Sequence, residues 1–220
     1  MDFLTFTELP ADVAEQLAVN AGIVLKTFDP VAAKEAIAAG GTTLETYVQT
    51  YIIPNIMYAT TGGINYSCVA EYSDWFEDVD NAPKGTKEGK HLDSWAATMS
   101  GTALTYNAEN IVSMLGAADS TTTDGITTIE PRMTIQSTDF KDLWYLTDWN
   151  GGFIAMQLID AFSDGGFTHQ STDNGKGQAS FSYTGHKTAT DLDRPPMRFK
   201  LFPKPETTNT ETQNTETQGA

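Results

Sequence analysis

Apolar and polar residues alternate with a period of two through most of this 220-residue chain, and this pattern restricts the fold more than any other feature. It is cleanest in three segments: Ile64–Tyr72, Gln178–Lys187 and Met197–Phe202. In the last of these, Met197, Phe199 and Leu201 are expected to face the core. Alternation of this kind is typical of antiparallel strands that are buried on one side. Less regular strand candidates are Gly22–Phe28, Leu92–Leu104, Thr127–Gln136, Phe140–Thr147 and Phe153–Asp160.

Glycine-containing turn signals separate these segments, and the strongest is Asn174-Gly175. An Asn-Gly pair favours a tight hairpin, here between Phe167–Asp173 and Gly177–His186, which would place His169 opposite Ser180. Eight or nine short strands with this spacing predict a mainly β protein, an antiparallel sandwich or barrel.

Two helices are expected beside the strands. Ala108–Leu115 follows a capping Asn107, carries an apolar stripe and ends at Gly116. Val31–Ala39 follows Pro30 and lies in an alanine-rich stretch, 30–53, that we interpret as an insertion.

The charge balance excludes several classes of function. Thirteen basic and 29 acidic residues give a net charge of −16, which argues against a protein that grips nucleic acid or an anionic membrane surface. No apolar run reaches the roughly 20 residues of a membrane helix, and the acidic start does not resemble a secretory signal. A single cysteine, Cys68, fits a reducing compartment. We therefore expect a soluble protein made inside the cell.

The long connection Ser73–His91 is the strongest candidate for an interaction site. Its first half is acidic and aromatic and its second half is basic, and long loops in compact domains are commonly functional. The alternative is a solvated loop whose aromatic residues pack on the core. The predicted contact residues are Trp75, Phe76, Glu77, Asp78, Asp80, Lys84, Lys87 and Lys90.

The residues give little sign of catalysis or metal binding. The strand spacing separates His169 from His186 by about 20 Å, so they cannot share a zinc ion. Cys68 lies on the apolar side of its strand, where a small buried hydrophobe is expected. The carboxylates Asp139, Asp142 and Asp148 flank an aromatic run and invite comparison with an acid-pair hydrolase. Residues 143–146 are better explained as a strand buried on both faces, and we predict no enzyme activity, no cofactor and no metal.

The C-terminal segment differs in composition from the rest. From Pro203 the chain is polar and contains the unit NTETQ twice, so we predict one domain over residues 1–202 and a flexible tail over 203–220.

Three longer stretches, Ala59–Trp95, Ile129–Leu158 and Gly165–His186, together with the pattern T-x-N-G-K-G-Q…S-x-x-x-T-G-H, resemble the tail tube, or major tail, proteins of long-tailed bacteriophages. The likeness extends from about Leu9 to Phe202. The stretch from Val31 to about Ile53 looks longer than is usual in that family.

The resemblance implies a β-sandwich flanked by a helix, six copies of which form a ring with strands lining a central channel. It implies rings that stack into a tube, with 73–91 bridging one ring to the next. The partners would be further copies, the terminator, tape-measure and baseplate or tip proteins, and DNA that passes without specific binding. The protein would be assembled in the bacterial cytoplasm and located in the virion tail.

Two other functions stay open at this point. One is a tube protein of a contractile tail or a secretion-like apparatus. The other is a carbohydrate-binding or hydrolytic phage β-sandwich, for which the Asp142 side chain would be essential.

Overall fold

The computed structural model describes residues 20–171 and 173–204. Its first elements, before the long hairpin, are β1 Ile23–Leu25, α2 Pro30–Ala39, α3 Gly41–Tyr47, the π-helix η2 Val48–Ile52 and the 3-10 turn η3 Ile53–Asn55. The later elements are β2 Thr60–Asp74, β3 Lys90–Ala103, α4 Ala108–Leu115, β4 Ala118–Thr123, β5 Ile126–Pro131, the 3-10 turn η4 Ser137–Asp139, β6 Lys141–Trp149, β7 Gly152–Ser163, β8 Thr168–Gln170, β9 Gln178–Thr184 and β10 Met197–Phe202.

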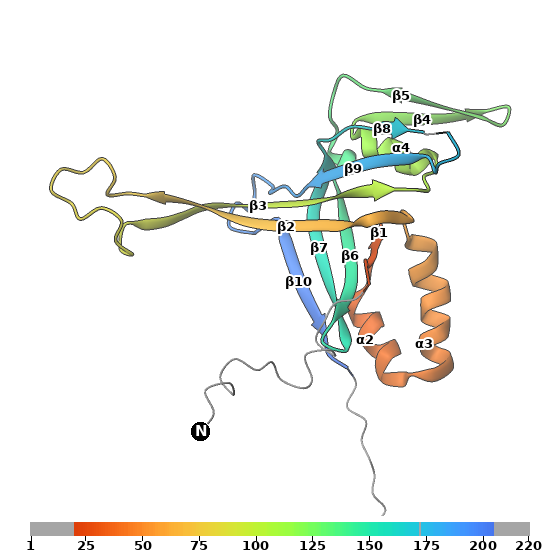
Figure 1. Ribbon diagram of the computed structural model, residues 1–220, viewed down its shortest axis with the longest axis horizontal. Coiled ribbons are helices and arrows are strands. Elements are labelled where there is room, and N and C mark those ends of the chain that lie inside the picture. Colours follow the sequence, from red (N-terminus) through yellow and green to blue (C-terminus); the bar gives the residue numbers. More distant parts are fainter. Residues whose placement is uncertain (1–19, 172, 205–220) are drawn as a thin grey trace, which may run out of the picture.

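Apart from β4 and β5, the strands form two antiparallel sheets that cross each other in Figure 1. The first has the order β1-β6-β7-β10, and the second contains β2, β3, β9 and the short β8. The end of β7 joins them, because Phe162 pairs with Thr184 and Ser163 pairs with Tyr183 of β9. The predicted mainly antiparallel β fold is therefore confirmed.

The main core lies where the two sheets and α4 meet. It is formed by buried residues of both sheets, among them Leu143 and Leu158 of the first and Met99, Phe181 and Tyr183 of the second. The alternation in β9 is confirmed, since Ala179, Phe181 and Tyr183 are all buried. Two sheets that pack face to face across interdigitating side chains are the sandwich arrangement.

The first sheet is buried on its other face as well. Trp144 and Ala155 point away from the main core and pack with Phe28 and Phe202 under the helical stretch α2–α3–η2. The prediction that residues 143–146 form a strand buried on both faces is confirmed for Leu143, Trp144 and Tyr145, and Leu146 is partly buried. Within the helical stretch, Ala33, Ala36 and Tyr47 are buried and pack with Phe28 and Phe202.

Both predicted helices are present. The Asn107 side chain accepts a hydrogen bond from the Asn110 amide, and α4 ends at Gly116, whose φ of 77° suits glycine. The Asp29 side chain caps α2 by accepting from the amides of residues 31 and 32. The helical continuation through α3 and η2 is not signalled by its threonine-rich sequence.

Several predicted strand features are wrong in detail. The Asn174-Gly175 hairpin is not tight: pairing of β8 with β9 starts at Gln170 and Gln178, so His169 lies opposite Ala179 instead of Ser180. The candidate Thr127–Gln136 is paired only to Pro131, and β5 forms a separate two-stranded sheet with β4, which the sequence pattern did not reveal. The candidate Gly22–Phe28 is a strand only over Ile23–Leu25.

In β10 the predicted apolar face is only partly buried. Met197 packs on the main core, but Phe199 and Leu201 are exposed by 44% and 49%. The reason is visible in Figure 1, where β10 continues past the second sheet, so no described element covers its far end on that side.

Candidate assembly surfaces

The hairpin of β2 and β3 forms an arm, residues 69–96, that extends well away from the body of the protein (Figure 1). Pairing continues from the body to the last pair, Asp74 with Lys90, so the arm is a two-stranded ribbon. The arm loop, residues 75–89, is its tip. The sequence placed the candidate site in this loop but did not show that two paired strands carry it outward.

The arm exposes several large apolar side chains to solvent. Those more than two-fifths exposed are Val69, Tyr72, Trp75, Val79 and Leu92. Near the tip, both faces of the ribbon carry such groups, because Tyr72 pairs with Leu92 on one face and the Trp75 ring stacks on His91 at 4.2 Å on the other. Lys90 lies over the Tyr72 ring at 5.1 Å. Exposed aromatic groups edged by charge are typical of protein interfaces.

The arm loop is held in shape by Asp74. One carboxylate oxygen accepts a hydrogen bond from the Phe76 amide and the other from the Gly85 amide, both at 3.0 Å. The Trp75 amide also donates to the Gly89 carbonyl at 2.9 Å. A Cβ at Gly89 would lie 2.4 Å from Asp74 Oδ1 and 2.9 Å from the Phe76 ring, so this position needs glycine.

The predicted contact residues therefore divide into two kinds. Phe76 is partly buried and supports the loop from inside, whereas Trp75 is 65% exposed and does not pack on the core. The charged residues are exposed and stay available for a partner: Glu77, Asp78, Asp80, Lys84, Lys87 and Lys90. Lys87 lies 3.7 Å from the neighbouring Glu88, an exposed pair that contributes little to stability.

Replacement of Asp74 by Asn should loosen the arm loop without changing the body. An amide has one acceptor oxygen, so one of the two backbone bonds is lost, and hydrogen exchange at the Phe76 and Gly85 amides should become faster. Asp78→Asn is the matched control, because the Asp78 side chain is exposed in the same loop. Equal exchange in both variants would show that Asp74 does not hold the loop.

The same two backbone bonds lower the pKa of Asp74 below its ordinary value of 3.8. A lowered pKa means that the ordered loop binds the proton less well than the disordered loop. The ordering contribution of Asp74 is therefore complete above pH 3.8 and is lost as the pH falls through the lowered pKa.

A second surface is the uncovered end of the first sheet. Phe199 pairs with Met156 and Leu201 pairs with Ile154, so these four apolar side chains lie on one face. The Phe199 and Tyr66 rings are arranged edge to face, with their centroids 6.0 Å apart. In Figure 1, the far end of β10 lies past the second sheet.

The outer edge of β2 is a third surface. This 15-residue strand pairs only with β3 within the described part of the chain. It carries Glu71 and Asp74 but no lysine or arginine, and long unprotected edges of this kind readily pair with another strand.

The carboxylates of the hydrolase alternative have structural roles. Asp142 accepts from the Gln157 side chain at 2.8 Å and from the Asp160 amide at 3.0 Å. Asp139 pairs with Arg132, and Asp148 accepts from the Asn20 side chain. Asp142 and Asp148 lie six residues apart on β6, about 20 Å. This exceeds the roughly 5–10 Å that separates the acids of a glycosidase pair.

Other predicted sites can now be located. Cys68 is partly buried beside Tyr66, and burial raises the pKa of its thiol. His169 Nδ1 lies 2.6 Å from the Tyr106 hydroxyl, and His186 Nδ1 lies 3.2 Å from the Asp160 carbonyl. Among residues 20–171 and 173–204, no three His, Cys, Asp or Glu side chains gather as a metal site, and no helix is long and apolar enough to cross a membrane.

Comparisons with known proteins give only distant structural likenesses. No family model matches the chain, and no curated protein matches it. One similar solved structure is the virion of a native gene transfer agent particle, at 12% identity and a TM-score of 0.37, covering 66% of this chain and 87% of that one. Another is the tail of an empty gene transfer agent particle with C6 symmetry, at 10% identity and a TM-score of 0.40, covering 84% and 99%. Likenesses this distant do not establish a family or a function.

Proposed function

We propose that this chain is a structural virion protein that assembles as hexameric rings stacked into a phage tail tube. The observation that carries the proposal is the arm. In a single chain, the exposed side chains of Tyr72, Trp75 and Leu92 contribute little hydrophobic stabilisation. They would be buried, and the arm stabilised, if another copy covered them.

The open edges and the uncovered sheet face support lateral assembly. Pairing of the β2 edge with another copy would satisfy its backbone groups, and repetition around a ring would leave no free edge. The Phe199 and Leu201 face would be buried in the same step. A head-to-tail contact along the axis does not close and therefore produces a filament, which is what stacked rings require.

The arm loop is suited to set the order of the stack. Its acidic residues Glu77, Asp78 and Asp80 precede its basic residues Lys84 and Lys87, so one loop offers both signs of charge. Complementary charges fix register and partner choice more than they raise affinity. A loop of this kind would serve equally in the tube of a contractile tail, and a sheath around the tube in the virion would distinguish the two.

The net charge agrees with a conduit for DNA. Six copies at −16 carry a formal charge of −96 per ring. A channel lined by part of this charge repels phosphates, so DNA passes through without being held.

Electron microscopy of the purified full-length protein, expressed alone, tests the proposal. We expect rings or hollow tubes with six copies per layer. Isolated globules at high protein concentration would overturn it.

A further inference from the structure

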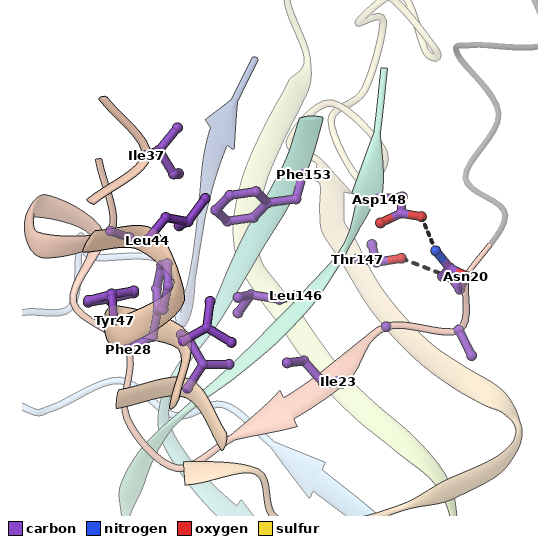
Figure 2. Close-up of a pocket in the computed structure, with 15 residues that line it drawn as sticks. Asn20, Ile23, Phe28, Ile37, Leu44, Tyr47, Leu146, Thr147, Asp148 and Phe153 are labelled. Atoms are coloured by element: carbon purple, nitrogen blue, oxygen red, sulfur yellow. Dashed lines mark hydrogen bonds between the residues drawn. The ribbon is translucent and has the colours of Figure 1, made fainter. Parts of the chain in front are cut away.

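A cavity of about 460 Å³ lies between the helical stretch α2–α3–η2 and the first sheet (Figure 2). Its walls are apolar and include Ile23, Phe28, Ile37, Leu44, Ile52 and Phe153. Ile37 and Leu44 are only partly buried, and both lie on the helical side of the space in Figure 2. The buried residues of α2 are the small Ala33 and Ala36, so this helix fills little of the space beside the sheet.

At one rim of the cavity, polar side chains of β6 form hydrogen bonds with Asn20, the first described residue. The Asn20 side chain donates to Asp148, and the Thr147 hydroxyl donates to the Asn20 carbonyl at 3.2 Å. Figure 2 shows these bonds beside the apolar walls. Residue 20 is therefore fixed at the cavity, and the preceding 19 residues start from its rim.

The sequence of residues 1–19, which lie outside the described part, has an apolar pattern that complements the cavity. Val13 and Leu17 are spaced by four, which places them on one face of a helix that Pro10 would begin, with Leu9 directly before it, while Asp12 and Glu15 fall elsewhere. Leu17 is three residues from Asn20, which is at most about 10 Å of chain. Val13 is a further turn away, about 6 Å if helical. Both are within reach of the cavity.

We propose that residues 9–17 of the same chain dock in this cavity and insert Leu9, Val13 and Leu17 between the helices and the sheet. The N-terminal segment would then complete the layer that α2 and α3 leave incomplete. The competing occupants are the same segment of another copy and a small apolar ligand, since the volume lies within the usual range for ligand pockets.

The test uses anilinonaphthalene sulfonate, whose fluorescence rises in apolar sites, with full-length protein and a variant lacking residues 2–18. Both are measured at a concentration where the protein is monomeric. We expect a several-fold larger fluorescence for the truncated protein, reversed by adding a peptide of residues 1–19. Ile37→Trp in the truncated protein should abolish the increase, because the larger ring occupies the cavity.

Matched substitutions in the full-length chain separate the apolar face from the rest of the segment. L9S/V13S/L17S should bind the probe as the truncated protein does, whereas D12S/E15S should resemble the unaltered protein. Equal probe binding by the full-length and truncated proteins would overturn the proposal.

Two further results would also contradict it. If the full-length protein excludes the probe from the cavity only at concentrations where copies associate, the cavity is filled by the N-terminal segment of a neighbouring copy. An apolar molecule recovered by solvent extraction of the full-length protein would assign it to a ligand. Because the test is made on monomers, its outcome does not depend on whether rings form.

Discussion

A variant in which Asn-Gly replaces residues 75–89 is expected to fold normally and to form no tubes. The last paired residues of the arm, Asp74 and Lys90, lie opposite each other, so a two-residue turn joins them without a change of register. The arm loop contributes no residue to the three buried clusters. Its loss should therefore change the free energy of unfolding by less than about 0.5 kcal/mol.

Electron microscopy and urea unfolding of this variant give the two readouts. We expect an unchanged unfolding midpoint and, at most, separate rings, because the lateral surfaces are intact. Trp75→Ser should weaken stacking in the same direction. Met133→Ser is its control, since Met133 is a fully exposed apolar residue outside the arm. Tubes of normal length from the Asn-Gly variant would show that the arm does not bridge rings.

The second large effect concerns the core and not assembly. Phe181→Ala should lower the free energy of unfolding by about 3–5 kcal/mol, the usual cost of emptying a buried aromatic site. Phe181 is 2% exposed, stacks on Tyr58 at 4.8 Å and covers Gly101, where no Cβ fits beneath the ring. Such a loss is a large part of the about 5–15 kcal/mol that stabilises a typical domain.

Phe199→Ala is the matched control for this substitution. The same side chain is removed, but Phe199 is already 44% exposed and leaves no enclosed cavity, so the destabilisation should be about half as large. Urea unfolding of both variants as monomers makes the comparison. Similar losses would mean that the core is not centred on β9. A defect in tube formation by Phe199→Ala would in addition place the uncovered sheet face in an interface.

Local patterns predicted the elements whose burial they encode directly. The alternation Ala179, Phe181, Tyr183 specified the inner face of β9, and Asn107 with Gly116 specified the ends of α4. The alternation within one strand does not show how far the facing sheet extends over it. For that reason Phe199 and Leu201 were expected in the core, although their face of β10 is left open.

The sequence predicted which residues form the arm loop, but not that the loop lies at the end of an extended arm. Opposite charges beside Trp75 marked the loop, whereas the outward extension of the arm depends on β9 pairing with β3 only over Thr98–Ala103. The role of Asp74 as the support of the loop follows from hydrogen bonds to amides 2 and 11 residues away, which no sequence period reveals. The cavity beneath α2 was missed for a similar reason, since it depends on small side chains meeting a distant sheet.

The central claim is that the chain completes its surfaces only with copies of itself. End-on electron micrographs of the full-length protein, expressed alone and concentrated, test this most directly. The account predicts closed six-fold rings around an open channel, with side views of stacked layers. Particles that remain single chains of 23.9 kDa at every concentration would contradict it.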